Sequence, residues 1–274
     1  MAKTKIECRK IYKIYVRPGS VDYIIALQDV SLKVHDGEFI CIVGPTGCGK
    51  STLLNIIAGL THPSKGEVLL DGKQIRGPGL DRIMVFQEYA LFPWKTVLGN
   101  VEFGLEMKGV PKKERQEIAK KWIAKVGLKG FESKYPFELS GGMKQRVALA
   151  RALAVDPEVL LMDEPFASVD AQTRNVLKAE LLKIWEDTQK TVIYVTHNIL
   201  EAVFFADKVV VFTARPGRIK EVVRITAPRL RKLSSPEISK IRDHLIDVIK
   251  EEVMASMKNE VKGIDIHEIE KRIV

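Results

Sequence analysis

The residues with the clearest chemical meaning form a glycine-rich run, Gly44-Pro-Thr-Gly-Cys-Gly-Lys-Ser51. Its spacing, G-x-x-x-x-G-K-S, is typical of a loop whose backbone N–H groups surround phosphate oxygens. Glycine lets the chain turn tightly enough for these groups to point inward. Lys50 is predicted to reach the β- and γ-phosphates, and the Ser51 hydroxyl to ligate Mg²⁺. The predicted nucleotide-binding residues of this segment are Gly44, Pro45, Thr46, Gly47, Cys48, Gly49, Lys50, Ser51 and Thr52.

Two consecutive carboxylates, Asp163 and Glu164, follow an apolar run. A phosphate-loop site that hydrolyses a nucleotide needs one carboxylate for Mg²⁺ and another group to orient water. Asp163 leaves the run first and suits the metal, and Glu164 suits the general base. On its own, an Asp-Glu pair before Pro165 would be interpreted as a surface turn. Beside a phosphate-binding loop, it predicts a catalytic pair.

These residues must be positioned by buried strands. The runs 39–43, 159–162, 192–195 and 209–212 are apolar on both faces, which is typical of strands in a parallel sheet. Helical patterns lie between them, including 52–58, closed by Gly59, and 178–186. Strands that alternate with helices predict an α/β core. Residues 5–34 show polar–apolar alternation and are predicted to form antiparallel strands.

Residues 89–157 interrupt this alternation with helical patterns. Ile118, Trp122 and Val126 fall four apart before Gly127, and 141–154 indicates another helix. We therefore expect a nucleotide-binding domain over 1–228 with a helical insertion at about 89–157.

The remaining segment, 229–274, is predicted to be a helical tail. Ser235-Pro236 is a good helix start, and an apolar stripe runs from Ile238 to Met257. A short second helix is expected after Gly263. The stripe fits either packing on the parent domain or binding to a partner.

Composition narrows the class of protein. The chain has 274 residues, 46% hydrophobic and 29% charged, which is typical of a globular protein and excludes a disordered one. Three cysteines imply no disulfide framework. We expect no secretory leader and no bilayer span, since no apolar run approaches about 18 residues. The net charge of +9 fits a solvated helix face, and also a surface for nucleic acid or anionic lipid.

Together with the segment Leu139-Ser-Gly-Gly-Met143, these motifs resemble the ATP-binding subunit of ABC transporters. The signature of that family usually ends in Gln, so Met143 departs from it. The likeness covers about residues 5–225. It implies a P-loop NTPase (RecA-like) core, an N-terminal antiparallel β subdomain and an inserted α-helical signature subdomain, with ATP and Mg²⁺ as cofactors.

The resemblance also implies roles for residues outside the phosphate loop. Gln87 is similar to the glutamine that touches Mg²⁺ and the attacking water, and His197 to the histidine that contacts the γ-phosphate. Each could instead be an ordinary structural residue. The family's usual Asp after the histidine is Asn198 here. Asp170 resembles the carboxylate of the D-loop, although Ser168 and Val169 replace the usual Ala and Leu.

Ser140 sits where a helix N-cap belongs, and capping is its simplest role. The resemblance implies a second one, because family members dimerise head-to-tail. Ser140, Gly141 and Gly142 would then face the γ-phosphate held by the other copy. An aromatic residue upstream of the phosphate loop usually stacks on adenine, and Tyr15 is the first candidate and Tyr23 the second.

The run Gln87–Asn100, with Leu-Phe-Pro-Trp at its centre, resembles importer subunits for nitrate, sulfonates and taurine. The Ala214-Arg-Pro-Gly-Arg218 run points the same way. The resemblance implies integral membrane permease subunits as partners, a solute-binding protein as an indirect one, and a place on the cytoplasmic side of the membrane. Phe92 and Trp94 would touch the permease, or else be ordinary core residues. No nucleic-acid partner is expected.

Three other functions remain alternatives at this point. The first is a soluble ABC ATPase that acts on nucleic acid or ribosomes, which the positive charge permits. The second is a regulatory module without hydrolysis, against which Lys50, Asp163, Glu164 and His197 argue. The third is an exporter ATPase, which is commonly fused to a membrane domain.

Overall fold

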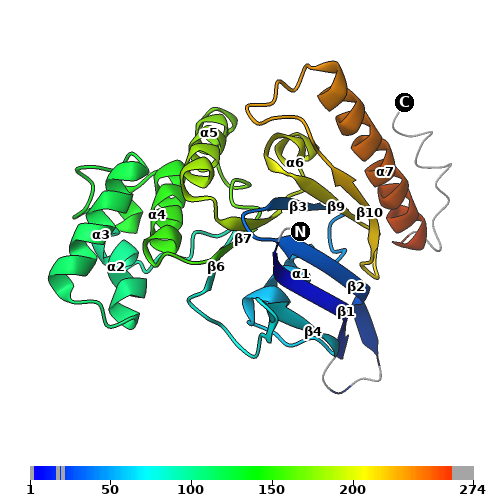
Figure 1. Ribbon diagram of the computed structural model, residues 1–274, viewed down its shortest axis with the longest axis horizontal. Helices are drawn as coiled ribbons and strands as arrows, with labels where there is room; N and C mark the ends of the chain where they lie inside the picture. Colours follow the sequence, from blue (N-terminus) through cyan, green and yellow to red (C-terminus); the bar gives the residue numbers. More distant parts are fainter. Residues whose placement is uncertain (1–2, 17–18, 20–21, 261–274) are drawn as a thin grey trace.

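Two β-sheets organise the chain in the computed structural model, which describes residues 3–16, 19 and 22–260 (Figure 1). The strands of the larger sheet are β3 (Phe39–Val43), β6 (Arg82–Val85), β7 (Val159–Asp163), β8 (Thr191–Val195), β9 (Lys208–Phe212) and β10 (Ile219–Arg224). They lie in the order β10-β9-β3-β8-β7-β6, and only the edge strand β10 is antiparallel. The predicted parallel sheet is confirmed.

The larger sheet is buried because helices cover it. These are α1 (Lys50–Ala58), α5 (Ala171–Thr188) and α6 (Ile199–Phe205). Side chains of β3 alternate between two cores: Phe39 and Cys41 join the core that includes α5 and α6, while Ile40 and Ile42 join the core that includes α1. In a strand that is apolar on both faces, every side chain can thus pack in one of the two cores. The α/β prediction is confirmed.

The smaller sheet is antiparallel, with the order β2-β1-β4-β5. Its strands are β1 (Thr4–Val16), β2 (Tyr23–His35), β4 (Lys65–Leu70) and β5 (Lys73–Gln74). In β2, Val30, Leu32 and Val34 are buried, as their alternation predicts. Helix α1 lies between the two sheets in Figure 1, and its Leu53 shares a core with Ile6 of β1.

The segment predicted as a helical insertion contains α2 (Val97–Met107), α3 (Lys112–Lys125), a 3₁₀ turn (Pro136–Glu138) and α4 (Gly141–Ala154). These helices gather at one side of the molecule (Figure 1). The helix expected from the spacing of Ile118, Trp122 and Val126 is α3, and Val126 at its C-terminal cap is buried. Ala119 and Ile123 are fully buried, whereas Ile118 and Trp122 lie at the flank and are half-buried. The packing of α3 against both α2 and α4 decides this orientation.

The tail forms α7 (Pro236–Glu260), which begins at the predicted proline. Ile238 and Leu245 are buried, and the helix packs on α6 and β9 of its own chain. The predicted contribution of the Met257 side chain and the second helix after Gly263 lie outside the described residues. Over the described part of the chain, no helix is long and apolar enough to cross a bilayer.

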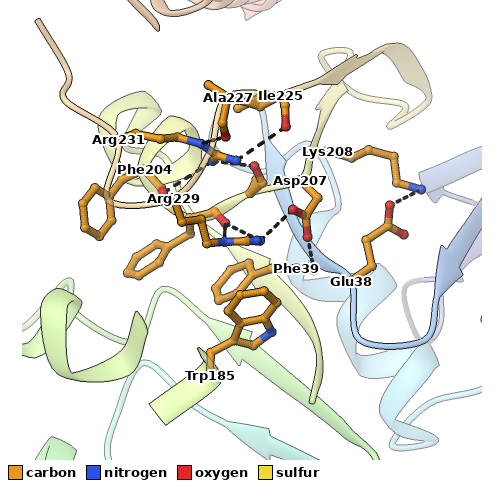
Figure 2. A network of polar contacts seen from close by, with 12 residues as sticks. Glu38, Phe39, Trp185, Phe204, Asp207, Lys208, Ile225, Ala227, Arg229 and Arg231 are labelled. Carbon is orange, nitrogen blue, oxygen red and sulfur yellow. Dashed lines mark hydrogen bonds and ion pairs between the residues drawn. The ribbon is translucent and has the colours of Figure 1, made fainter. Parts of the chain in front are cut away.

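Two arginines anchor the linker that leads to α7 (Figure 2). Arg229 pairs with Asp207 at 2.7 Å, and its guanidinium lies 3.8 Å from the ring centroid of Trp185. Asp207 also accepts the backbone N–H of Phe39 at 2.9 Å. Arg231 is buried, and within the described part of the chain its guanidinium donates to backbone carbonyls alone. These acceptors belong to Val203, Phe204, Ala206, Ile225 and Ala227. The linker is thereby tied to the end of α6 and to the start of β3.

Candidate functional site

The glycine-rich loop joins β3 to α1, in the strand–loop–helix context that its motif requires. Gly47 and Gly49 have φ values of 73° and 103°, in the left-handed region. A Cβ atom on Gly49 would lie 2.7 Å from the Ala26 carbonyl oxygen, so only glycine fits there. Gly49 caps α1 without a side-chain acceptor. The first N–H groups of α1 therefore remain available to an anion.

Lys50 is only 6% exposed, and its ammonium group lies inside this loop. It donates to the carbonyls of Gly44 and Pro45, both at 2.9 Å. The buried Cys48 thiol lies beside it, with Sγ 3.9 Å from Nζ. Burial raises the pKa of Cys48, although the charge of Lys50 acts in the opposite direction. The thiol is therefore protonated at neutral pH and leaves the positive charge of Lys50 uncompensated.

The metal-binding candidates Ser51 and Asp163 meet across the sheet. Ser51 Oγ donates to Asp163 Oδ1 at 3.0 Å, from the start of α1 to the end of β7. The pKa of Asp163 is raised, mainly by burial and further by the charge of Glu164. The hydrogen bond from Ser51 acts in the opposite direction and lowers this pKa. A nearby cation would relieve the penalty of burial. Adjacent hydroxyl and carboxylate oxygens at a phosphate loop fit Mg²⁺, which prefers such ligands.

Glu164 and His197 also contact one another. Glu164 Oε2 lies 2.8 Å from His197 Nδ1. Glu164 has a φ of 44°, which non-glycine residues rarely adopt, and its N–H donates to the Val195 carbonyl at 3.0 Å. His197 Nδ1 is the donor in the tautomer that carries the proton on that nitrogen. The strained backbone therefore places the carboxylate over the end of β8.

Asn198, which stands where the family usually has Asp, acts as a helix cap. Its Oδ1 accepts the N–H groups of Leu200 at 2.9 Å and Glu201 at 3.3 Å, which caps α6. Asn caps a helix about as well as Asp does. The start of α6, and with it the position of His197, is maintained.

A cavity of about 750 Å³ joins these groups. Ten of the site residues predicted from the sequence line it: Tyr15, Thr46, Gly47, Gly49, Lys50, Ser51, Thr52, Gln87, Glu164 and His197. Gly44, Pro45 and Cys48 are buried beneath this lining. Sequence reasoning missed Ile24, Ala26 and Arg215, which also line the cavity.

Of the two tyrosines predicted to stack on adenine, Tyr15 lines the cavity and Tyr23 does not. In the β1–β2 pairing, Tyr15 lies opposite Ile24, while Tyr23 lies opposite Val16. Because successive side chains of a strand point to opposite faces, Tyr15 and Ile24 share one face and Tyr23 points to the other. Tyr15 and Ile24 line the cavity with the phosphate loop.

Asp163 does not line this cavity itself but contacts its lining residue Ser51, whereas the predicted site residues at the starts of α4 and α5 lie outside it. Ser140 caps α4, and its Oγ accepts the Met143 N–H at 3.3 Å. Asp170 caps α5 by accepting from the Thr173 backbone at 3.0 Å, and this contact lowers the pKa of Asp170. Gly141 and Gly142 follow Ser140 in the first turn of α4. A role for these residues at the nucleotide stays a prediction.

A second hollow, of about 500 Å³ and mainly apolar, is lined in part by the chain neighbours of Gln87. Gln87 lines the cavity, while its neighbours Phe86 and Ala90 line this groove together with Phe92 and Met107. Trp94 stands beside Phe92, with ring centroids 5.7 Å apart, and is 71% exposed.

The exposed Trp94 lies on a fixed segment. The buried amide of Asn100 accepts the Phe92 N–H at 2.8 Å and donates to the carbonyls of Phe92, Lys95 and Thr96 at 3.0–3.1 Å. Of the two predicted contact residues, Trp94 is therefore on the surface and Phe92 is half-buried.

Comparison with known proteins gives consistent matches. The family described as ABC transporter matches residues 27–167. An uncharacterised ABC transporter ATP-binding protein of Methanocaldococcus jannaschii is 59% identical, over 85% of this chain and 86% of its own. A nitrate import ATP-binding protein of Synechocystis is 47% identical (81% and 83% covered). A taurine import ATP-binding protein of Roseobacter denitrificans is 49% identical (74% and 76% covered).

The solved structures agree with this. A dimeric ATP-binding cassette in a post-hydrolysis state, bound to ADP and Pi, superimposes with a TM-score of 0.72 and 33% identity. The match covers 81% of this chain and all of that one.

Proposed function

Since the chain belongs to the ABC transporter family and is an ATPase of its ATP-binding-cassette type, we propose that it is the ATP-hydrolysing subunit of an importer. It would act on the cytoplasmic face of a membrane, bound to separate permease subunits. The observation that carries the proposal is the apolar groove, because its lining residue Phe86 directly precedes Gln87 of the nucleotide cavity and its lining residue Phe92 contacts the exposed Trp94.

Each group around the nucleotide has a proposed task. Lys50 and the loop N–H groups bind the phosphates, and Ser51, Gln87 and Asp163 hold Mg²⁺, which supplies charge compensation when bound. Glu164 accepts the proton of the attacking water. His197 orients Glu164 through their 2.8 Å hydrogen bond and contacts the γ-phosphate.

We further propose that two copies enclose two nucleotides head-to-tail. Ser140, Gly141, Gly142 and Asp170 lie outside the cavity of their own chain, at the starts of α4 and α5. The start of an α-helix attracts anions, so a second copy would bring this group to the γ-phosphate. The dimeric cassette bound to ADP and Pi supports this arrangement.

The groove suits a short apolar segment of a permease. Gln87 and the groove residues Phe86 and Ala90 belong to one segment. A movement of Gln87 on loss of the γ-phosphate would therefore shift the residues that line the groove. The relatives named for nitrate and taurine import indicate that a small solute such as nitrate, a sulfonate or taurine is carried, in concert with a solute-binding protein.

Affinity purification from detergent-solubilised membranes tests the proposal. The tagged chain should recover a multi-span permease, and Trp94→Ala together with Met107→Asp should reduce that recovery. Leu230→Ala is the matched control, because Leu230 is as highly exposed as Trp94 (75% and 71%) but does not line the groove. Recovery of soluble partners alone, or ATPase stimulation by RNA or DNA, would contradict the importer. The ligand of the solute-binding protein that accompanies the permease would identify the solute.

A further inference from the structure

The loop between β9 and β10, residues 213–218, packs directly on the phosphate-binding loop. β9 lies beside β3 in the sheet, so both strands end at the same edge. The Gly217 N–H donates to the Ala26 carbonyl at 3.0 Å, and a Cβ atom on Gly217 would lie 2.0 Å from the Cys48 carbonyl oxygen. Residues 213–218 therefore lie in close contact with the phosphate-binding loop at the edge of the nucleotide cavity.

Arg215 extends from this loop into the cavity. Its Nε and Nη2 donate to the Gly47 carbonyl at 3.2 and 3.1 Å. A guanidinium has five N–H groups, so three remain for another acceptor. Among the described residues, no carboxylate pairs with Arg215 and no other acceptor bonds to its side chain. Arg215 is exposed, lines the cavity and stays charged at every physiological pH.

We propose that Arg215 is an additional ATP-binding residue that donates to a phosphate oxygen, and that α7 holds it in place. The cavity wall beside Arg215 is formed by Thr46 and Gly47 of the phosphate loop. The planar fork of a guanidinium matches phosphate oxygens. Lys50 already binds the loop from inside, so Arg215 adds a cation from the outer side.

The support from α7 comes through one carboxylate. Glu252 Oε2 accepts the Ala214 N–H at 2.7 Å, next to Arg215, and Oε1 pairs with Lys220 of β10 at 2.9 Å. Its side chain is only 14% exposed. The neighbouring Glu251 pairs with the same lysine at 2.7 Å but is 70% exposed and makes no contact with the loop. The far end of α7 is held by the arginine-anchored linker (Figure 2). Helix α7 thus braces residues 213–218 against the phosphate loop.

Binding measurements on the isolated chain test the role of Arg215. Arg215→Ala should weaken Mg-ATP binding about tenfold, the lower end of the range for a hydrogen bond to a charged group. Arg218→Ala is the matched control, since it removes the same charge from the same loop, where the Arg218 side chain bonds to no described residue. Arg215→Lys should give an intermediate affinity. Competition by inorganic triphosphate should weaken by the same factor as ATP. Unchanged triphosphate affinity, or equal effects of Arg215→Ala and Arg218→Ala, would overturn the phosphate contact.

A second set of variants tests the link to α7. Glu252→Ala should raise KM for ATP severalfold with little change in kcat, whereas Glu251→Ala should leave both unchanged. Glu252→Gln should restore most of the affinity, because its amide oxygen can still accept from Ala214. In the Arg215→Ala background, Glu252→Ala should add nothing. Additive losses in the double variant would show that Glu252 does not act through Arg215.

Discussion

At the phosphate-binding loop, single positions decide whether the loop can form. Gly49 combines a left-handed backbone with a wall formed by the Ala26 carbonyl and the Leu27 side chain, each 2.7 Å from where a Cβ atom would lie. Gly72 has a similar left-handed φ of 78° but open space around it. A comparison of substitutions at Gly49 and Gly72 therefore separates the effect of backbone strain from the effect of steric crowding.

We predict that Gly49→Ala weakens nucleotide binding at least about tenfold, because left-handed strain alone costs roughly 1–2 kcal/mol and the crowding adds to it. Gly72→Ala should cost a similar strain in stability and leave binding unchanged. Titration with a fluorescent ATP analogue measures both. Equal affinities for the two variants would mean that the loop tolerates a side chain at position 49.

Residues with a distinctive chemistry at a fixed spacing could be predicted from the sequence. Lys50, Ser51 and Asp163 are of this kind, and the structure brings them together. Arg215 could not be predicted, because its place depends on β9 lying beside β3, which is a property of the sheet. The sequence singled out the run 214–218 only as a resemblance. The choice between Tyr15 and Tyr23 likewise needed the register of β1 and β2.

Among the elements, α6 connects the catalytic region to the tail. Asn198 caps its first turn beside His197, and Arg231 donates to carbonyls at its last turn. A cation at a helix C-terminus satisfies carbonyls that have no partner inside the helix. Arg231 is buried, so water cannot replace it.

Replacement of this arginine tests how the linker stabilises the fold. Arg231→Met keeps most of the side-chain volume but leaves buried carbonyls without donors. We expect the free energy of unfolding to fall by about 2–3 kcal/mol, measured by urea denaturation without nucleotide. Lys232→Met removes an exposed charge next to it and should change stability by less than about 0.5 kcal/mol. Similar stability for both variants would show that the carbonyl contacts contribute little.

The strands were easier to predict than the faces of the helices. Runs that are apolar on both faces, such as 39–43 and 159–162, have few alternatives to a buried strand, and both are strands in the structure. In α3, the positions 118 and 122 compete with 119 and 123 for the buried face. Contacts with α2 and α4 settle that competition, and these contacts are not visible in a single segment.

For the whole molecule, the arrangement of the two groups of site residues is the central feature. One group surrounds the cavity at the phosphate loop, and the other lies at the starts of α4 and α5. In the proposed head-to-tail pair of chains, both groups would meet at each nucleotide. Hydrolysis would then end the contact between the copies, so a chain that binds ATP without hydrolysing it should remain paired.

The most direct measurement is size-exclusion chromatography of Glu164→Gln with and without Mg-ATP, beside a phosphate-release assay. Gln keeps the shape of the side chain but cannot take a proton, so turnover should fall about 10²–10⁴-fold while ATP binding persists. This variant should elute as a dimer only with Mg-ATP. Lys50→Ala should lose nucleotide affinity and remain a monomer. Near-normal hydrolysis by Glu164→Gln, or a monomer at saturating Mg-ATP, would contradict the account.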